Sequence, residues 1–95
     1  MKDWTTRDVR ERALRILAER GWEAGAGGED GPVGADWAIA IASGEAYSGG
    51  APAPDGPYLT TMTEIEYVLE RGSLMDWEMK EGRTVDEVMD LLRQL

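Results

Sequence analysis

Residues 36–44, DWAIAIASG, form the one apolar run of the chain, and the segments on either side need such a surface to pack on. The large apolar residues of this run alternate with alanine, a period of two that fits a β-strand. Alanine, however, favours helices over strands. Asp36 is suited to begin a helix and Gly44 to end one. No second β-rich run offers a partner strand, so we predict a short buried helix over residues 37–43.

The segment before this run has the periodicity of an amphipathic helix over residues 6–20. Its apolar residues recur at helical spacing, and Thr5 or Thr6 supplies the side-chain oxygen of an N-cap. Gly21 is suited to end the helix because glycine enters the left-handed conformation without steric cost. Trp22 follows and is predicted to fold back onto the core together with Trp37.

Two later segments carry similar helix signals, over residues 61–71 and 85–94. Each begins with a threonine followed three residues later by glutamate, the pattern of a capping box: Thr61 with Glu64, and Thr84 with Glu87. Between them, residues 73–82 hold too many apolar side chains for a plain loop, so we expect a short helical turn or an irregular segment there.

Glycine and proline separate these elements in two loops, residues 23–35 and 45–57. The length of 95 residues suits one domain with a single modest core. We therefore predict one globular domain over residues 1–95, an all-α bundle of about four helices at 6–20, 37–43, 61–71 and 85–94. The glycine spacing of the first loop matches no phosphate-binding motif.

The composition excludes several kinds of chemistry. The chain has no cysteine and no histidine, which removes disulfides, thiolate metal sites and the commonest general base. No apolar stretch approaches the roughly 20 residues that span a bilayer, and the N-terminus lacks a signal-peptide pattern. We therefore expect a cytoplasmic protein with no catalytic residue, no cofactor and no bound metal.

The net charge of −9 is unevenly distributed. Residues 1–20 carry six basic and four acidic side chains, whereas residues 21–95 carry four basic and fifteen acidic ones. The acidic part disfavours binding to nucleic acid or to an anionic membrane. It permits binding to a basic partner, and the partner that we predict is a protein with a basic or apolar surface, such as a host protein if the gene belongs to a phage; a homodimer is also possible.

Short motifs spread over most of the chain point to a family. They are RGW at residues 20–22, GPV at 31–33, AIAIASG at 38–44, DW at 76–77, GRT at 82–84 and the VDEV segment at 85–88. In these motifs the chain resembles a family of small actinobacterial and actinobacteriophage proteins of unknown function. The resemblance implies a bacterial or phage origin, hence the host cytoplasm for a phage-encoded protein, and it brings no activity with it.

The most promising surface lies just before the last helix. Tryptophan is enriched at interface hot spots, and methionine makes adaptable apolar contacts. We therefore predict a protein-binding surface, with an acidic rim and an arginine able to clamp a carboxylate. Its candidate residues are Trp77, Met75, Met79, Asp76, Glu78 and Arg83. The function that this predicts is non-enzymatic binding of a protein, such as engagement or inhibition of a host protein by a phage-encoded factor.

Two alternatives stay open from the sequence. The first is a small enzyme or divalent-metal module, because carboxylates gather around residues 76–90, at Asp76, Glu78, Asp86 and Asp90. The second is a homo-oligomeric structural protein, with Leu74, Met75 and Leu91 as spare apolar residues for a dimer interface.

Overall fold

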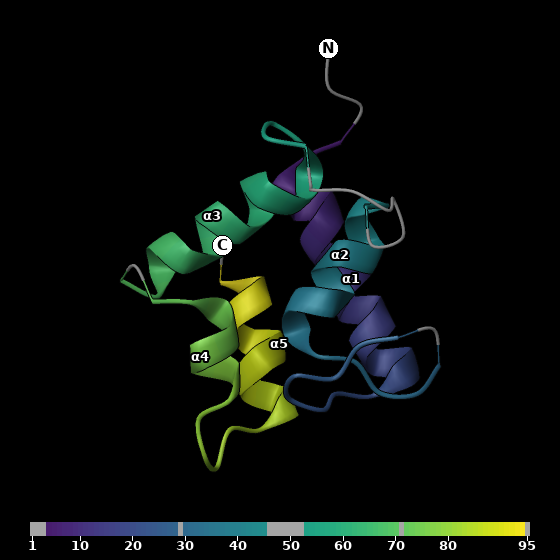
Figure 1. Cartoon of the computed structure of the whole chain (residues 1–95), viewed down its shortest axis with the longest axis vertical. Helices are drawn as coiled ribbons and strands as arrows, with labels where there is room; N and C mark the ends of the chain where they lie inside the picture. The colour runs from purple at the N-terminus through teal and green to yellow at the C-terminus, as the bar shows by residue number, and fades with distance from the viewer. Residues whose placement is uncertain (1–3, 29, 46–52, 71, 95) are drawn as a thin grey trace.

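The computed structural model describes residues 4–28, 30–45, 53–70 and 72–94 and contains five helices in this part of the chain (Figure 1). No strand occurs in these residues, so the all-α prediction is confirmed while the helix count rises from four to five. In chain order the helices are α1 Thr6–Arg20, α2 Ala35–Ser43, α3 Pro57–Val68, α4 Leu74–Glu78 and α5 Val85–Arg93.

The apolar run at residues 36–44 is a helix, α2, and it lies at the centre of the packing. It contacts α1, α3 and α4, and α1 in turn contacts α3 and α5. The alanines allow these close approaches: Ala38 and Ile39 are fully buried, and Ala42 is nearly so. Gly44 ends the helix in the left-handed conformation, as predicted. The N-cap, however, is Gly34 rather than Asp36, which lies in the first turn.

The core gathers one apolar stripe from each long helix around α2. Burial of these side chains removes apolar area from water and supplies the main favourable term in folding. The core residues are Val9, Ala13, Leu17, Val33, Ala35, Ala38, Ile39, Ala42, Ile65, Leu74, Val88, Leu91 and Leu92. Trp22 and Trp37 pack against this core but are only partly buried, and both use their indole N–H groups.

The third helix differs from its prediction at both ends. It begins at Pro57, so Thr61 lies inside the helix, where it is fully buried and caps nothing. A proline at the first helical position suits a helix start, and the N–H of Tyr58 is satisfied by a carboxylate of Glu45, far from any local capping pattern. The helix also ends early, at Val68 rather than residue 71.

The segment after α3 is a helix of its own rather than an irregular turn. Ser73 caps α4, because its hydroxyl accepts a hydrogen bond from Asp76 N at 3.3 Å. Leu74 is fully buried and Leu91 is 4% exposed. Neither is a spare apolar residue, so of the three residues predicted for a dimer interface only Met75 reaches the surface.

The first glycine-rich loop is pinned to the body at several points. Residues Trp22 and Val33 form an isolated parallel bridge, with hydrogen bonds of 3.2 Å from Val33 N to Gly21 O and from Glu23 N to Val33 O. The guanidinium of Arg20 donates to two further loop carbonyls, those of Gly31 and Gly28. The buried Val33 anchors the loop in the core, as its apolar character predicts.

Within the described residues, no helix has the length and apolar character needed to cross a membrane.

Candidate functional site

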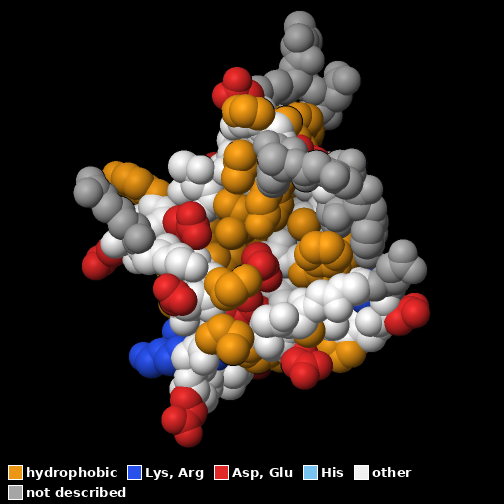
Figure 2. Space-filling model, viewed as in Figure 1, with side chains coloured by type: hydrophobic (Ala, Val, Ile, Leu, Met, Phe, Trp, Pro, Cys, Tyr) orange, Lys and Arg blue, Asp and Glu red, His pale blue; other side chains and the backbone are white. Residues whose placement is uncertain are grey.

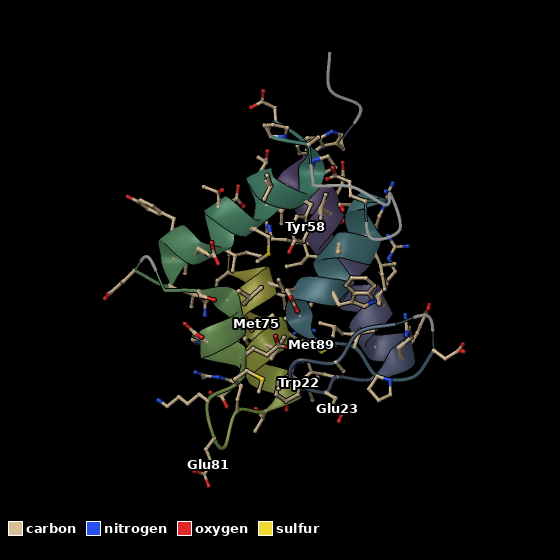
Figure 3. The ribbon with its side chains drawn as sticks, viewed as in Figure 1. Trp22, Glu23, Tyr58, Met75, Glu81 and Met89 are labelled. Atoms are coloured by element: carbon tan, nitrogen blue, oxygen red, sulfur yellow. The ribbon has the colours of Figure 1, made fainter. Side chains whose placement is uncertain are left out.

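The predicted binding surface is centred on α4, where two methionines point to solvent. The side chain of Met75 is 48% exposed and that of Met79 is 57% exposed. Asp76, between them in sequence, is exposed too. Figure 2 shows hydrophobic side chains gathered across the middle of this face, with acidic side chains between and around them. Figure 3 shows Met75 beside α4 and, on the turn that follows this helix, Glu81 directed away from the body.

Met79 also borders the glycine-rich loop. A Cβ added at Gly25 would lie 3.2 Å from the sulfur of Met79, so the loop backbone approaches this side chain closely. Gly25 has φ +76°, a conformation that favours glycine. Met79 therefore stands at the junction of α4 with the loop.

The side chains of Trp77 and Arg83 stack on each other, close in sequence to the methionines. Trp77 is partly buried against the core, and the guanidinium carbon of Arg83 lies 3.8 Å from the centroid of its ring. Arg83 Nε also donates to the Trp77 carbonyl at 3.1 Å, and Arg83 Nη1 lies 2.7 Å from Glu87 Oε2. With its side chain only 12% exposed, Arg83 fastens the turn between α4 and α5 and has little freedom to clamp a partner's carboxylate.

Glu78 is the one candidate that the structure places in the interior. Its exposed fraction is 0%, so it cannot contribute to a docking surface. Its Oε1 accepts hydrogen bonds from Trp22 Nε1 at 2.7 Å and from Ala35 N at 2.5 Å. Ala35 is the first residue of α2, which has no side-chain cap of its own. A carboxylate at this position satisfies an orphan amide and interacts favourably with the helix dipole.

The electrostatics of Glu78 oppose its ionisation on balance. Burial raises the pKa of its carboxyl above the ordinary value, the hydrogen bonds from Ala35 and Trp22 lower it, and the nearby Asp36 carboxylate raises it again. The second oxygen, Oε2, is buried and has no hydrogen-bond partner among the described residues. Glu78 therefore has one oxygen that accepts two hydrogen bonds and a second, buried oxygen that takes no part in them.

Glu78 belongs to a cycle of three glutamates that cap the middle helices. Glu45, just after α2, accepts a 2.9 Å hydrogen bond from Tyr58 N at the start of α3. Glu66, within α3, accepts a 3.1 Å bond from Leu74 N at the start of α4. Glu78, at the end of α4, accepts the hydrogen bond from Ala35 N at the start of α2. Each of these helices thus positions the next, and the last positions the first.

The outer helices begin differently. In α1, Thr5 and Asp8 form a capping box, and in α5 Thr84 and Glu87 do the same. Both pairs lie within four residues; the sequence predicts a threonine N-cap for α1 and the complete capping box for α5. The cycle of Glu45, Glu66 and Glu78 joins residues 8 to 43 positions apart. Sequence patterns offer only one signal for it, namely that Gly34 and Gly56 precede α2 and α3 and cannot cap them with a side chain.

The carboxylates on the last helix do not assemble with those of α4. Asp86 and Asp90 are exposed on α5, whereas Glu78 faces α2. In the described part of the chain, no group of three or more acidic side chains is gathered so that it could hold a metal ion. The acidic segment at residues 76–90 is therefore divided between helix caps, a core anchor and solvated side chains.

Comparison with known proteins gives the family of the chain without a function. No curated protein and no solved structure matches it significantly. One family model, described as a family of unknown function, DUF6197, matches residues 1–95. Because this match covers the whole sequence, the chain belongs to the DUF6197 family of unknown function.

Proposed function

We propose that the protein is a non-enzymatic binding protein whose α4 docks Met75 and Met79 into an apolar depression on a partner protein. The observation that carries this proposal is the exposure of both methionines: Met75, 48% exposed, lies on the five-residue helix α4, and Met79, 57% exposed, is its C-cap. Flexible, polarisable methionine side chains are suited to contact surfaces that adapt to a partner. An apolar pair with a polar surround matches the usual anatomy of an interface.

The charge around the methionines supports a basic partner. Asp76 and Glu81 are exposed on α4 and the turn after it, and Lys80 is an exposed cation between them in sequence. Residues 21–95 as a whole carry fifteen acidic and four basic side chains. Acidic groups around an apolar contact favour encounter with a positively charged surface and repel polyanions such as nucleic acid. The proposed partner is therefore a protein whose apolar pocket is rimmed by lysine or arginine.

Rigid support beneath α4 strengthens this proposal. A five-residue helix is not stable alone and depends on tertiary contacts. Leu74 is buried below it, Glu78 ties its end to α2, and Arg83 closes the following turn over Trp77. Holding the contact residues in place before binding reduces the conformational entropy lost on association. In this proposal Glu78 and Arg83 position the surface, and Met75 and Met79 make the contact.

The resemblance to small actinobacteriophage proteins suggests a setting for such binding. A phage-encoded protein of this kind would act in the host cytoplasm by covering part of a host protein and altering its activity sterically. This form of the proposal needs no cofactor and no catalytic residue. The same surface serves equally well if the gene is chromosomal and the partner is a protein of the same cell.

The two alternatives have less support in the geometry. A metal-dependent module would need carboxylates that converge, and those at residues 76–90 diverge within the described structure. A homodimer would have to use the methionine pair itself, because Leu74 and Leu91 are already buried in the monomer. Light scattering at increasing concentration separates self-association from binding to another protein.

The proposal is tested by affinity capture from a lysate of the cells in which the gene resides. The wild-type chain is compared with Met75→Ser/Met79→Ser and with the control Tyr67→Ser, which removes a large apolar side chain that is 83% exposed on α3. We expect the same basic protein to be enriched by the wild type and by the control, and to be lost with the double variant. Equal enrichment by all three proteins would contradict the proposal.

A further inference from the structure

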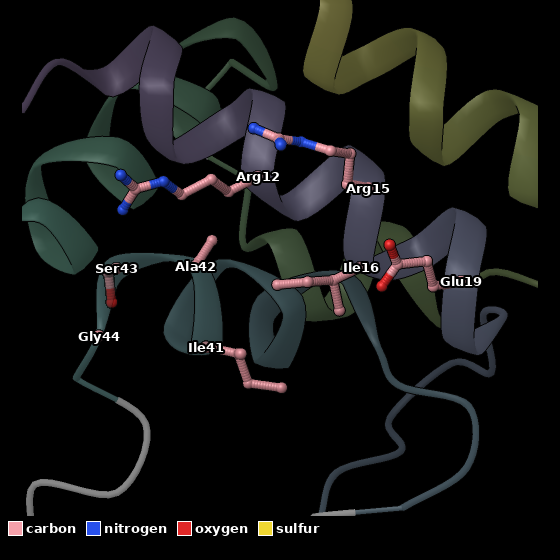
Figure 4. Close-up of a pocket in the computed structure, with 8 residues that line it drawn as sticks. All are labelled: Arg12, Arg15, Ile16, Glu19, Ile41, Ala42, Ser43 and Gly44. Atoms are coloured by element: carbon pink, nitrogen blue, oxygen red, sulfur yellow. The ribbon is translucent and has the colours of Figure 1, made fainter.

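A second surface lies in the groove between α1 and α2, and no residue of α4 lines it. The groove has a volume of about 410 Å³. Its apolar wall is formed by Ile16 of α1 with Ile41 and Ala42 of α2, and it reaches Ser43 and Gly44 at the end of α2. Figure 4 shows Arg12 and Arg15 extending along one side of this groove in the same direction, with Glu19 at its far end.

The two arginines of the groove differ from every other arginine that the structure describes. Arg7, Arg10, Arg83 and Arg93 each form an ion pair with a carboxylate, and Arg20 donates to two backbone carbonyls. Within the described residues, Arg12 and Arg15 have neither an ion pair nor a hydrogen bond, although the chain carries nineteen carboxylates. Asp8 and Glu11, four residues before them, are engaged instead in the capping box and in the Arg7–Glu11 pair. Glu19, four residues after Arg15, lines the same groove, but the described structure contains no ion pair between the two.

The spacing of Arg12 and Arg15 allows them to bind one ligand together. Residues three apart in a helix lie on one face, so the two guanidinium groups share one rim of the groove. Guanidinium groups present planar sets of N–H donors that match a carboxylate or a phosphate. The apolar wall beneath them adds a requirement that a simple anion does not meet, namely an aliphatic group attached next to the negative charge.

We propose that this groove binds an acidic peptide segment of a partner protein, with a carboxylate on Arg12 and Arg15 and an adjacent aliphatic side chain against Ile16 and Ile41. The choice of a peptide over nucleic acid rests on charge. Outside residues 1–20 the chain is strongly acidic, so a polyanion is repelled beyond the two arginines, whereas an isolated carboxylate is not. None of the α4 residues lines this groove, so the site is independent of the methionine surface.

The test is an NMR titration of the isotope-labelled chain with two acetylated, amidated pentapeptides. One alternates leucine with glutamate, and the other has glutamine in place of each glutamate. We expect the glutamate peptide to shift the amide signals of Ile41, Ser43 and Gly44. We expect its dissociation constant to rise about tenfold or more with the glutamine peptide, since each hydrogen bond to a charged group is then weakened.

The variant Arg12→Gln/Arg15→Gln should show the same loss of affinity for the glutamate peptide. The matched control is Arg7→Gln/Arg93→Gln, which removes two exposed arginines and the same charge from outside the groove; it should bind as the wild type does. Circular dichroism checks that both variants are folded. Equal affinities for the two peptides, equal losses in the two variants, or equally tight binding of inorganic phosphate would each overturn the proposal.

Discussion

Glu78 Oε1 and Trp22 Nε1 are joined by a 2.7 Å hydrogen bond that links positions 56 residues apart. The same oxygen accepts the N–H of Ala35, so one buried carboxylate connects the end of α4, the start of the glycine-rich loop and the start of α2. Because α4 has only five residues, this junction decides where Met75 and Met79 stand. The position of the exposed methionines therefore depends on the hydrogen bonds of the buried glutamate.

Removal of the Glu78 carboxylate should destabilise the whole domain. Glu78→Ala leaves the N–H groups of Trp22 and Ala35 without their acceptor and opens a cavity, at a cost of about 3 kcal/mol. Glu78→Gln keeps an acceptor at this place and should cost clearly less. The free energy of unfolding from urea titration measures both, and equal losses in the two variants would show that the hydrogen bonds contribute little.

The pH dependence of stability should carry the signature of Glu78. Its pKa in the native state is raised, mainly by burial, so the native state holds its proton more tightly than the unfolded chain does. The resulting stability is fully present below the ordinary glutamate value and is lost as the pH rises through the raised native value. Urea titrations across this window should show wild type losing stability relative to Glu78→Gln, whereas parallel curves for the two proteins would contradict this assignment.

Glu87 should act in the opposite direction and in a lower window. Hydrogen bonds from the Thr84 backbone and from Arg83 lower the pKa of its carboxyl. Its contribution is therefore present above the ordinary value and is lost as the pH falls through the lowered native value. In Glu87→Gln, the free energy of unfolding should fall less on acidification than in wild type. The same decrease in both proteins at acidic pH, measured by urea titration, would argue against this role for the capping box.

Gly34 should tolerate no side chain. A Cβ at this position would lie 2.8 Å from Glu78 Oε1 and 3.2 Å from the carbonyl oxygen of Ala26, so Gly34→Ala should cost about 2 kcal/mol through overpacking. Gly27→Ala is the matched control from the same loop, because its nearest neighbour, Trp37, would lie at 3.4 Å. Thermal unfolding of both variants measures the difference, and equal melting temperatures would contradict the close packing around Glu78.

Arg83 should matter more than an ordinary surface arginine. Arg83→Ala removes the guanidinium stacked on Trp77 and its bond to the Trp77 carbonyl, for a loss of about 1–2 kcal/mol. Arg93→Ala removes a side chain that is 60% exposed and paired with Asp90 at i,i+3, which should cost little. Equal stabilities of these two variants in urea titration would show that the stacked arrangement contributes no more than a solvated ion pair.

The local part of this structure could be predicted from the sequence. The helix α1 begins and ends where its threonine, apolar stripe and Gly21 predict, and α5 begins at the capping box of Thr84 and Glu87. These signals act between residues that lie within two helical turns of each other. The buried helix α2 follows from the alanine content and the absence of a partner strand.

The parts that could not be predicted depend on contacts between distant residues. The sequence pattern Thr61–Glu64 resembles a capping box, yet Thr61 is buried inside α3 because Glu45 caps that helix from another segment. Likewise, Glu78 reads as one more acidic surface residue next to Asp76, and only the fold shows that its neighbours are Trp22 and Ala35. The surface roles proposed for Met75 and Met79 stay predictions.

The most direct test of the proposed α4 surface is photo-crosslinking from single positions in the cells in which the gene resides. A photoreactive amino acid is placed at Met75, at Met79 or, as the control, at the exposed Tyr67 of α3. We expect both methionine positions to crosslink to one and the same basic protein and position 67 to give no such crosslink. Crosslinking to that protein from position 67 alone, or to no protein from either methionine position, would contradict the proposed α4 surface.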